Sequence, residues 1–455
     1  MYELPAPVNM ALERLQRAGY EACLVGGCVR DLLRGKPPQD YDLSTSALPE
    51  QTETVFAGER LVETGLRHGT VTVLLEGMAL EITTFRVDGA YSDARRPDAV
   101  RFTPSLTEDL ARRDFTVNAM AWSPAAGLTD PFGGRADLEA GVLRCVGDPT
   151  LRFTEDALRI LRALRFSATL DFSIETETGK ALRALAPRLK LVSAERVYSE
   201  LCKLLCGLRA GQVILDWTEV LGVVLPELLP MRGFDQRNRH HCYDVLTHSV
   251  KTLEGVPPVP DLRWAALLHD LGKPAAFTLD EKGEGHFKGH PELSAAQTEQ
   301  ILHRLRASRV SRETVTELVR LHDRPIEPTA RAVRRVLSRY GAEFFSRLMQ
   351  LKRADNLAQA PEYRDRQQLY DRIEALERDI LREKPCLSLR ELAVDGNDLA
   401  ALGIPRGPKL GRTLQTLLDG VLDGTLENER ETLLRAARPV SDMTKDAGKT
   451  HDSSR

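Results

Sequence analysis

The 455-residue chain has no C-x-x-C pair, and its seven cysteines follow no regular spacing. A disulfide framework is therefore not indicated, which is typical of proteins in a reducing compartment. The amino-terminal segment MYELPAPVNMALERL lacks the apolar core of a secretory signal. No stretch approaches 18 consecutive apolar residues, so we expect no membrane span. These absences predict a cytoplasmic protein.

Neither sign of charge dominates the composition. The net charge is −3 with 28% charged residues, which excludes a strongly basic, histone-like binder but permits a local basic surface. Residues 1–140 mix helical segments with β-rich ones such as EACLVGG and TVTVLLEG. From about residue 141 onward, apolar residues recur at helical spacing almost throughout. We therefore predict an α+β head followed by an all-α remainder.

Proline-containing breaks and changes of pattern divide the helical part further. We predict a head at 1–140, a neck and body at 141–225, a helical domain at 226–385, a helical tail at 386–440 and a disordered end at 441–455. Residues 141–240 contain 15 Lys and Arg against 12 Asp and Glu. That excess of positive charge would suit the neutralisation of phosphates.

Two aspartates separated by one tyrosine follow a glycine pair in LVGGCVRDLLRGKPPQDYDLS, residues 24–44. On a strand, Asp40 and Asp42 would project from one face and repel each other unless a cation lay between them. Carboxylate oxygens suit Mg²⁺, which takes further ligands from water and phosphates. A solvated strand end is the alternative interpretation. Tyr41 would point the other way and is expected to pack.

Three nearby features favour the metal interpretation. Gly26 and Gly27 offer main-chain N–H groups to a phosphate, and Arg30 offers a cation in the helix that follows. Glu81, at the start of the predicted strand EITTF, could place a third carboxylate on a neighbouring strand. Together these features form the layout of a two-metal nucleotidyl-transfer site.

GGCVRDLLRG followed by DYDLSTSA resembles the start of the polymerase-β-type head of class II tRNA nucleotidyltransferases, the family of CCA-adding enzymes and bacterial poly(A) polymerases. The resemblance implies a mixed sheet with helices, catalytic carboxylates Asp40, Asp42 and Glu81, and Mg²⁺ held by Asp40 and Asp42. It also implies ATP and CTP as substrates and the 3′ acceptor end of tRNA as partner. The segment ETGLRHGTVTVLLEG is similar to the HGTV form of the tRNA-specific members, which favours tRNA.

LARRDFTVNAMAW contains Arg112, Arg113 and Asp114, which match the family's RRD motif and by resemblance hold ribose and triphosphate. Adjacent arginines on a strand would point to opposite faces, so we expect one of them to reach phosphate. A surface cluster of salt bridges is the alternative. The resemblance places the other nucleotide-binding residues at Gly26, Gly27, Arg30, Asn118, Asp156, Arg159, Arg162 and Arg165.

RFTEDALRILRALRF matches the family's EDxxR motif through Glu155, Asp156 and Arg159. On one helix, Asp156 and Arg159 would share a face, although an intrahelical ion pair is the more common use of that spacing. Asp accepts from an exocyclic amine and Arg donates to a ring acceptor, so the pair could admit cytosine and adenine and reject uracil and guanine. By resemblance, this protein template replaces a nucleic-acid template.

The segment TTFRVDGAYSDARRPDAVRFTPSLTEDL resembles the flexible loop of members that add A, which CC-only members are expected to lack; an ordinary polar loop is the alternative. We predict addition of CMP and AMP to the tRNA 3′ end with release of pyrophosphate. The alternatives are A-only addition, CC-only addition, poly(A) synthesis, an HD-type phosphohydrolase with an inactive head, and tRNA binding without catalysis. The oligomeric state is not indicated.

Histidines and aspartates recur in HCYDVLTHSV, AALLHDLGKP, GEGHFKGHPELSA, LVRLHDRP and LKRADNLAQ, and include His290 and His322. The pattern resembles an HD-type phosphohydrolase domain. The resemblance makes four residues the candidate ligands of a divalent metal: His248, His269, Asp270 and Asp355. Mn²⁺, Ni²⁺, Zn²⁺ or Mg²⁺ would suit these donors, and a bound ion could activate water for phosphoester hydrolysis. A structural relic is the alternative.

The segment ELAVDGNDLAALGIPRGPKLGRTLQTLL predicts two helices joined by a glycine-rich turn. Arg406, Lys409 and Arg412, near the start of the second helix, could contact a nucleic-acid backbone. A plain helix connector is the alternative. The segment resembles the tRNA-binding tail of HD-containing bacterial CCA-adding enzymes, so the resemblance spans about residues 8–438.

Overall fold

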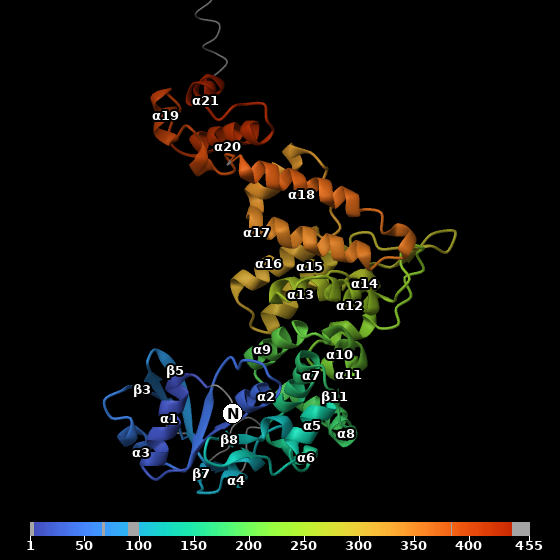
Figure 1. The fold of residues 1–455 in the computed structure, drawn as a ribbon. Coiled ribbons are helices and arrows are strands. Elements are labelled where there is room, and N and C mark those ends of the chain that lie inside the picture. The colour runs from blue at the N-terminus through green and yellow to red at the C-terminus, as the bar shows by residue number, and fades with distance from the viewer. Residues whose placement is uncertain (1–3, 66–68, 90–99, 384, 439–455) are drawn as a thin grey trace, which may run out of the picture. The chain divides into compact units, whose positions relative to one another are not determined.

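The computed structural model describes residues 4–65, 69–89, 100–383 and 385–438 (Figure 1). The chain forms two compact units, which are described separately. The first comprises Met1–Phe234, Pro257–Trp264 and Glu299–Arg312, and the second comprises Asp235–Val256, Ala265–Thr298 and Glu313–Arg455. The domain boundaries expected near 140, 225 and 385 stay predictions. The expected disordered end and residues 90–99 of the expected loop lie outside the described residues.

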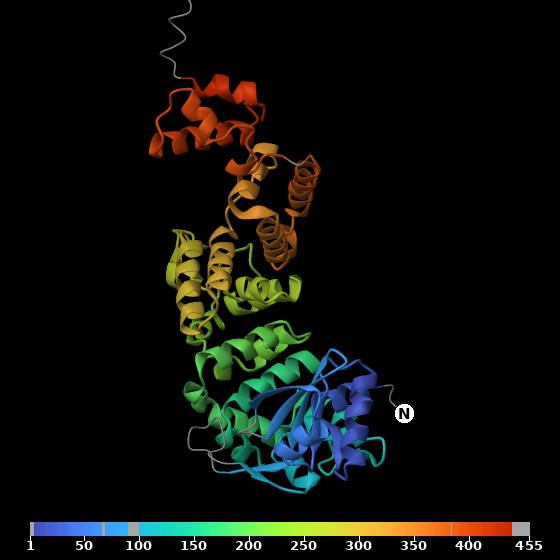
Figure 2. The same ribbon diagram turned by 90° about the vertical axis from the view of Figure 1, so that its left-hand side faces the viewer.

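A seven-stranded mixed sheet forms the centre of the head, in the order β3-β4-β5-β2-β1-β8-β9 (Figures 1 and 2). β2 and β5 pair in parallel, whereas the other neighbours pair antiparallel. The strands are β1 (Ala22–Val25), β2 (Asp42–Thr45), β3 (Arg60–Gly65), β4 (Thr70–Leu75), β5 (Met78–Thr84), β8 (Ala121–Ser123) and β9 (Gly127–Thr129). The predicted mixed sheet is confirmed.

The central strand β1 is buried on both faces of the sheet. Because side chains alternate along a strand, Leu24 packs with Leu12 in one apolar cluster, whereas Val25 packs with Phe85 in another. Five helices accompany the strands of the head: α1 (Ala6–Arg17), α2 (Gly27–Leu33), α3 (Pro49–Val55), α4 (Leu106–Ala111) and α5 (Gly134–Ala140). A 3₁₀ turn spans Thr116–Asn118, and β6 (Arg86–Asp88) pairs with β7 (Val100–Phe102). The antiparallel pairing of β1 with β2 places the end of β1 beside the start of β2.

Helices dominate the rest of the first unit, as predicted. They are α6 (Pro149–Glu155), α7 (Leu158–Leu170), α8 (Thr176–Leu185), α9 (Ala194–Leu205), α10 (Ala210–Asp216) and α11 (Thr218–Leu221), with 3₁₀ turns at Ala186–Leu191 and Pro226–Met231. α7 and α9 pack against each other. A parallel ladder of β10 (Val142–Leu143) and β11 (Ser173–Ile174) interrupts the helical part, which the sequence did not indicate.

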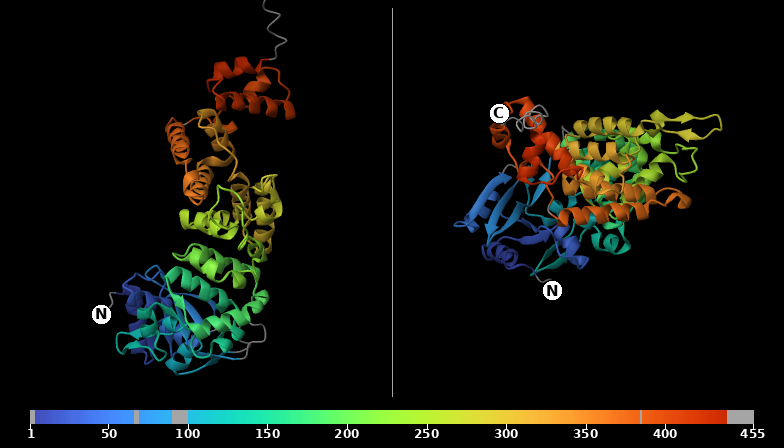
Figure 3. Two further views of the ribbon diagram at one scale, coloured as in Figure 1. Left: turned by 90° about the vertical axis from the view of Figure 1, so that its right-hand side faces the viewer. Right: turned by 90° about the horizontal axis from the view of Figure 1, so that it is seen from above.

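The second unit is built from helices, some of which begin or end in the first. They are α12 (Val245–Gly255), α13 (Pro260–Leu268), α14 (Lys273–Ala276), α15 (His290–Arg304), α16 (Arg309–Leu321), α17 (Ala330–Leu357) and α18 (Gln367–Arg382). α17 packs along α18 (Figures 1 and 3) and changes direction at Gly341, whose φ is 81°. A short hairpin joins β12 (Thr278–Leu279) to β13 (Gly285–His286).

Three helices follow near the C-terminus: α19 (Gly396–Ala401), α20 (Pro408–Leu422) and α21 (Arg430–Ala437). Leu399, Leu417 and Leu433 belong to a separate apolar core beneath them. 3₁₀ turns lie at Pro361–Tyr363 and Leu389–Glu391. Across the described residues, no helix combines the length and the apolar character needed to cross a membrane.

Candidate functional site

Asp42 and Glu81 are direct partners across the parallel strands β2 and β5. Asp42 is the first residue of β2, whereas Glu81 lies inside β5 and not at its start as expected. Both residues are exposed, and paired residues project from the same face of a sheet. Partial desolvation and the Glu81 carboxylate raise the pKa of Asp42, and Asp40 adds to the increase. The sheet therefore holds at least two mutually repelling carboxylates together.

Asp40 lies in a bend before β2. The expectation that Asp40 and Asp42 lie on one strand and project from the same face is therefore wrong in its placement of Asp40 on the strand. Pro37 and Pro38 precede the bend, and proline cannot donate to a strand ladder, so the strand begins late. Asp40 is still close enough to raise the pKa of Asp42. Tyr41 packs against the core of the head, as predicted.

Gly26 connects β1 to α2 at a point where the chain needs a left-handed conformation. Its φ is 76°, and a Cβ at this position would lie 2.9 Å from the Nη1 atom of Arg113. The positive charge of Arg113 lowers the pKa of Asp42, which places the guanidinium within reach of the carboxylates. A glycine here therefore permits a cation to lie over the strand end.

The RRD motif lies in the turn after α4, so the strand geometry assumed for Arg112 and Arg113 is wrong. Asp109 binds both arginines, with Oδ1 2.8 Å from Nη2 of Arg112 and Oδ2 3.3 Å from Nη2 of Arg113. Burial opposes ionisation, but the two guanidiniums hold the pKa of Asp109 below its usual range. Arg112 also lies 4.0 Å from Asp88, so the two arginines diverge. Asp109 was missed, although its spacing of three and four residues from the arginines was visible in the sequence.

A buried network links several of the residues predicted to bind the nucleotide. Arg30 donates to Asn118 Oδ1 over 2.7 Å, and Asn118 Nδ2 donates to Asp114 Oδ1 over 3.3 Å. Nε of Arg162 donates to Asp114 Oδ2 over 2.8 Å. Burial opposes ionisation of Asp114, but Arg162 and Arg159 outweigh it and lower the pKa to about 2. Asp114 thus acts as a fixed anchor for the arginine side chains.

Three guanidiniums gather around the ring of Phe166. Their Cζ atoms lie 5.4 Å (Arg30), 5.4 Å (Arg162) and 3.8 Å (Arg165) from its centroid. Arg165 pairs with Glu200 at 2.9 Å. Burial lowers the pKa of Arg165 to about 10, Glu200 opposes this, and the neighbouring arginines add to the decrease. This concentration of positive charge suits a polyanion. Phe166 and Glu200 were missed; the RALRF sequence could have indicated the ring.

Asp156 lies in a break between α6 and α7, with φ −133° and ψ 103°. The expectation that Asp156 and Arg159 share one helix is therefore wrong. Asp156 Oδ1 accepts from the N–H of Leu158, and Asp156 Oδ2 accepts from Nη2 of Arg196 over 2.9 Å. Arg159 Nη1 donates to Glu155 Oε2 over 2.7 Å. At this break, Arg196 orients the carboxylate of Asp156. The sequence did not reveal this contact, because the two residues are 40 positions apart.

The HD-type pattern forms one buried cluster in the second unit. His248 Nε2 lies 2.9 Å from Asp355 Oδ1 and 3.4 Å from Asp270 Oδ2, and His269 Nε2 lies 3.2 Å from Asp270 Oδ2. Burial alone would lower the pKa of His269, but Asp270 and Asp355 raise it to about 10. The four candidate ligands thus meet. His290 lies on the other side of Asp270, 3.3 Å from Oδ1.

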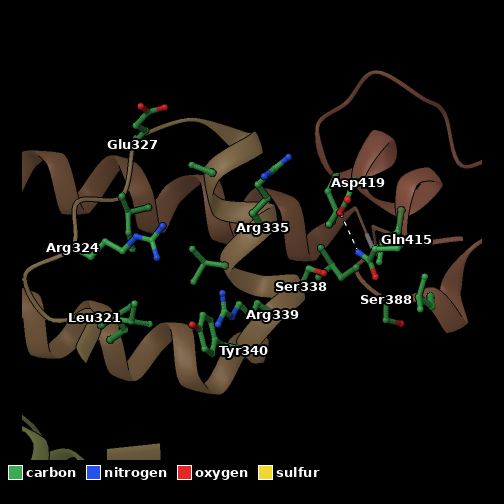
Figure 4. Close-up of a pocket in the computed structure, with 18 of the residues that line it drawn as sticks. Leu321, Arg324, Glu327, Arg335, Ser338, Arg339, Tyr340, Ser388, Gln415 and Asp419 are labelled. Atoms are coloured by element: carbon green, nitrogen blue, oxygen red, sulfur yellow. Dashed lines mark hydrogen bonds between the residues drawn. The ribbon is translucent and has the colours of Figure 1, made fainter. Parts of the chain in front are cut away.

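The candidate RNA-binding residues of the tail, Arg406, Lys409 and Arg412, are all exposed. Arg406 donates to Asn397 over 2.9 Å. A separate cavity of about 1120 Å³ lies among α16, α17 and α20 (Figure 4). Its lining includes Arg324, Arg335, Arg339 and Arg390. The rest of the lining is largely apolar and includes Glu327 and Asp419, and none of the three predicted residues lines the cavity.

Comparisons with known proteins cover most of the chain. Residues 22–144 match the model of the poly A polymerase head domain, and residues 290–437 match tRNA nucleotidyltransferase domain 2. Residues 171–231 match the "Probable RNA and SrmB- binding site of polymerase A". The CCA-adding enzyme of Leuconostoc mesenteroides is 36% identical over 428 residues, 94% of each chain. That of Streptococcus mutans is 35% identical over 436 residues, 95% of this chain and 96% of its own.

The chain belongs to the CCA-adding enzyme family of nucleotidyltransferases. A solved structure of the Bacillus stearothermophilus CCA-adding enzyme in complex with CTP has a TM-score of 0.73 and 28% identity, and the match covers 98% of this chain and 100% of that one. The Thermotoga maritima enzyme complexed with tRNA, 21% identical with a TM-score of 0.54, shows the same fold. The family and the polymerase-β-type head that the sequence predicted are confirmed.

We expect Asp42→Asn to raise the thermal unfolding midpoint in EDTA, because it removes one charge from the carboxylate cluster. Like charges at paired strand positions destabilise by about 0.2–1 kcal/mol. Mg²⁺ should then stabilise the native chain more than the variant. Scanning calorimetry measures both effects, with Glu50→Gln, at an exposed helix position of the head, as the matched control. A lower midpoint for Asp42→Asn in EDTA would contradict the assignment of repulsion.

We expect Asp114→Asn to lower the free energy of unfolding of the first unit by about 2 kcal/mol at pH 7. The folded pKa of Asp114 is about 2 and its ordinary value is 3.8, so ionised Asp114 stabilises the native state above the ordinary value. This stabilisation is lost as the pH falls from about 3.8 towards 2, so the gap between the two proteins should narrow there. Urea unfolding at pH 7 and at decreasing pH measures the gap. A pH-independent gap would contradict the electrostatic origin.

Proposed function

We propose that the chain adds CMP and AMP to the 3′ end of tRNA without a nucleic-acid template, using CTP and ATP and releasing pyrophosphate. The observation that carries the proposal is the in-register pair of Asp42 and Glu81 with Asp40 beside it, in the head of a family member. The named relatives, CCA-adding enzymes of matching length, support the same reaction. Such a reaction on tRNA would take place in the cytoplasm.

The carboxylates of the head fit a magnesium ion. Their donors are hard oxygens, and the raised pKa of Asp42 reflects desolvation and negative charge that a cation would offset. We propose that Asp40 and Asp42 hold the ion and that Glu81 supports them. When bound, Mg²⁺ supplies positive charge that favours ionisation of the tRNA 3′-hydroxyl and stabilises charge at the α-phosphate. The carboxylates orient this charge at one edge of the sheet.

The arginines of the head and neck would bind the triphosphate. Arg113 lies over Gly26 and near Asp42, so its guanidinium is suited to a phosphate oxygen beside the carboxylates. Arg30, Arg162 and Arg165 around Phe166 supply further positive charge. Asn118 holds the side chain of Arg30, and Asp114 holds that of Arg162. Little reorganisation of these arginines is therefore needed when the nucleotide binds.

Asp156 and Arg159 would read the base. A carboxylate oxygen has two acceptor positions, so Asp156 can accept from the exocyclic amine of cytosine or adenine while it keeps its bond to Arg196. Glu155 and the carbonyl oxygen of Arg112 hold the guanidinium of Arg159 in place. Uracil and guanine carry a carbonyl in place of the amine, so an acceptor oxygen of the base would face an acceptor oxygen of Asp156. Discrimination against uracil and guanine would therefore arise because these bases leave polar groups of the site without hydrogen-bond partners.

The partner of the reaction would be tRNA, bound through the basic helical region and the tail. The exposed cations Arg406, Lys409 and Arg412 are suited to phosphates of the nucleic-acid backbone. Such contacts would make the affinity fall as salt rises. Poly(A) synthesis and partial addition of A or of CC remain the rival reactions on the same motifs.

A substrate matrix tests the reaction. The chain is offered tRNA ending before CCA, after C and after CC, each with CTP, with ATP or with both, and products are resolved on sequencing gels. We expect CCA completion from all three ends when both nucleotides are present. Extension by A alone, by CC alone or by many A residues would identify one of the rivals instead.

Asp42→Ala should abolish incorporation and leave tRNA affinity within about twofold, because the carboxylate would act on the reacting atoms and not on the RNA backbone. Gel-based incorporation and a filter-binding titration measure the two properties. Glu50→Ala, at an exposed position of the same unit, serves as the control and should retain both. Persistent turnover by Asp42→Ala would exclude the proposed mechanism.

Asp156→Ala should reduce the preference for CTP over UTP by about 10-fold to 100-fold, because a rejected base no longer leaves the half-buried carboxylate without a donor. Competitive incorporation at the first position measures the ratio of kcat/KM for the two nucleotides. Lys180→Ala, which removes an exposed ion pair with Glu177 on α8, should leave the ratio unchanged. An unchanged ratio in Asp156→Ala would remove this residue from base selection.

A further inference from the structure

Phe166, a buried residue of α7, has three cations around its ring. The Cζ atom of Arg165 lies 3.8 Å from the ring centroid, and those of Arg30 and Arg162 each lie 5.4 Å from it. The guanidiniums also act on one another, because the charges of Arg162 and Arg30 add to the effect of burial in lowering the pKa of Arg165. Three groups that repel one another are therefore gathered at one aromatic side chain.

Hydrogen bonds hold two of the three guanidiniums. Arg30 donates to Asn118 Oδ1 over 2.7 Å and to Asp31 Oδ1 over 3.0 Å. Arg162 donates to Asp114 Oδ2 from Nε over 2.8 Å and also from Nη2. These polar partners define the positions of Arg30 and Arg162 without the ring.

Arg165 is held in a different way. Its Nε atom lies 2.9 Å from Oε2 of Glu200, but neither of these buried atoms has a hydrogen-bond partner. Its Cζ atom lies over the face of Phe166, since the atoms of the ring would keep it farther from the centroid in the ring plane. An aromatic face attracts a guanidinium through its negative charge and does not occupy the N–H donors as a carboxylate does. The ring thus holds the cation and leaves its donors available.

A second aromatic residue fixes the plane of the ring. Phe115, which directly follows the RRD motif, meets Phe166 edge to face, with centroids 5.8 Å apart and an interplanar angle of 81°. Phe115 is fully buried, and such edge-to-face pairs have a preferred geometry. Phe166 therefore presents a fixed face to Arg165.

We propose that Phe166 is a positioning residue for the triphosphate of the incoming nucleotide. Its ring face holds Arg165 against the repulsion of Arg30 and Arg162 and leaves the N–H donors of Arg165 free for phosphate oxygens. This role rests on the proposed function, because the triphosphate is the part that CTP and ATP share. It assigns the orientation of a phosphate-binding cation to an apolar side chain that itself makes no phosphate contact.

A purely structural role is the competing explanation, because loss of a buried ring leaves a cavity and destabilises the fold. The two roles depend on different properties of the ring. Packing depends on its volume, whereas the attraction for a guanidinium depends on the negative charge of its face. Fluorine atoms on the ring withdraw that charge and change the volume little, so fluorination separates the two roles.

A fluorinated series tests the proposal on the full chain. Phe166 is replaced by phenylalanine analogues that carry one, two or three ring fluorines, and circular dichroism establishes that each chain is folded. Isothermal titration calorimetry in EDTA measures the binding of inorganic tripolyphosphate, so that no metal ion at the carboxylates contributes. The Kd should rise with each added fluorine and reach about 5-fold above that of the native chain. A Kd that is independent of fluorine number would overturn the proposal.

Substitutions at the same position test the consequence for turnover. Phe166→Leu should raise the KM for CTP and for ATP by the same factor, about 10-fold, and this rise should account for most of the loss of kcat/KM. Phe166→Tyr keeps the ring and should have a KM close to that of the native chain. A loss of kcat at an unchanged KM, or a different factor for the two nucleotides, would overturn the proposal.

Phe172→Leu provides the matched control. Phe172 is also a buried ring with a guanidinium over it, since the Cζ atom of Arg34 lies 5.5 Å from its centroid. This pair lies outside the cluster around Phe166, so the variant should retain the native KM and the native Kd for tripolyphosphate. An equal rise of KM in Phe172→Leu would overturn the proposal, because it would mark the effect as a general result of core truncation.

The tripolyphosphate titration needs no turnover, so it separates this proposal from the proposed reaction. Binding that weakens with fluorination in a chain that incorporates no nucleotide would refute the reaction and not the role of the ring. Incorporation by a chain whose tripolyphosphate binding ignores the ring would refute the role of Phe166 alone.

Discussion

The parallel pairing of β2 with β5 is the constraint on which the head depends. It places Asp42 opposite Glu81 and, one residue further, the buried side chains of Leu43 and Ile82 opposite each other. Burial of the apolar pair favours this register, and a slip of one residue would turn the carboxylate of the slipping strand towards the core. The hydrophobic core thus holds together two groups whose charges repel.

The arginines of the head and of the helices that follow it are held by a different set of acids. Asp109 binds the arginines after α4, Asp114 binds Arg162, and Glu200 binds Arg165. Each of these acids is buried, so an unpaired charge would be costly and the pairs are well defined. Acidic groups that face solvent are thereby separated from acidic groups that position arginines. This separation lets carboxylates and guanidiniums lie close together without all of them pairing with one another.

The second unit concentrates charge by another route. Helix ends and faces, not strand register, bring its histidines and aspartates together, and carbonyl groups near those ends orient the rings. In the head, a sheet brings carboxylates to one edge; in this unit, a carboxylate at the centre faces imidazoles on both sides. Both arrangements bring ionisable side chains from separate elements close together.

Much of the chemistry was visible in the sequence, whereas its geometry was not. The motifs named the carboxylates, the arginines and the histidine cluster, because short spacings and residue types are local properties. The expected strand through Asp40, the strand at Arg112 and the single helix through Asp156 were wrong, because Pro37 and Pro38, the end of α4 and a break before α7 set the local backbone. A pattern of spacings does not reveal such interruptions when each residue suits more than one conformation.

The sequence by itself determined the class of the head, the helical remainder and the identity of most candidate ligands and contacts. Only the tertiary structure decided that Arg196 orients Asp156, that three arginines surround Phe166, and that Asp270 faces histidines with both oxygens. These contacts join segments tens of residues apart. Their partners depend on how buried helices and strands pack, and that packing is a property of the whole core and not of any one segment.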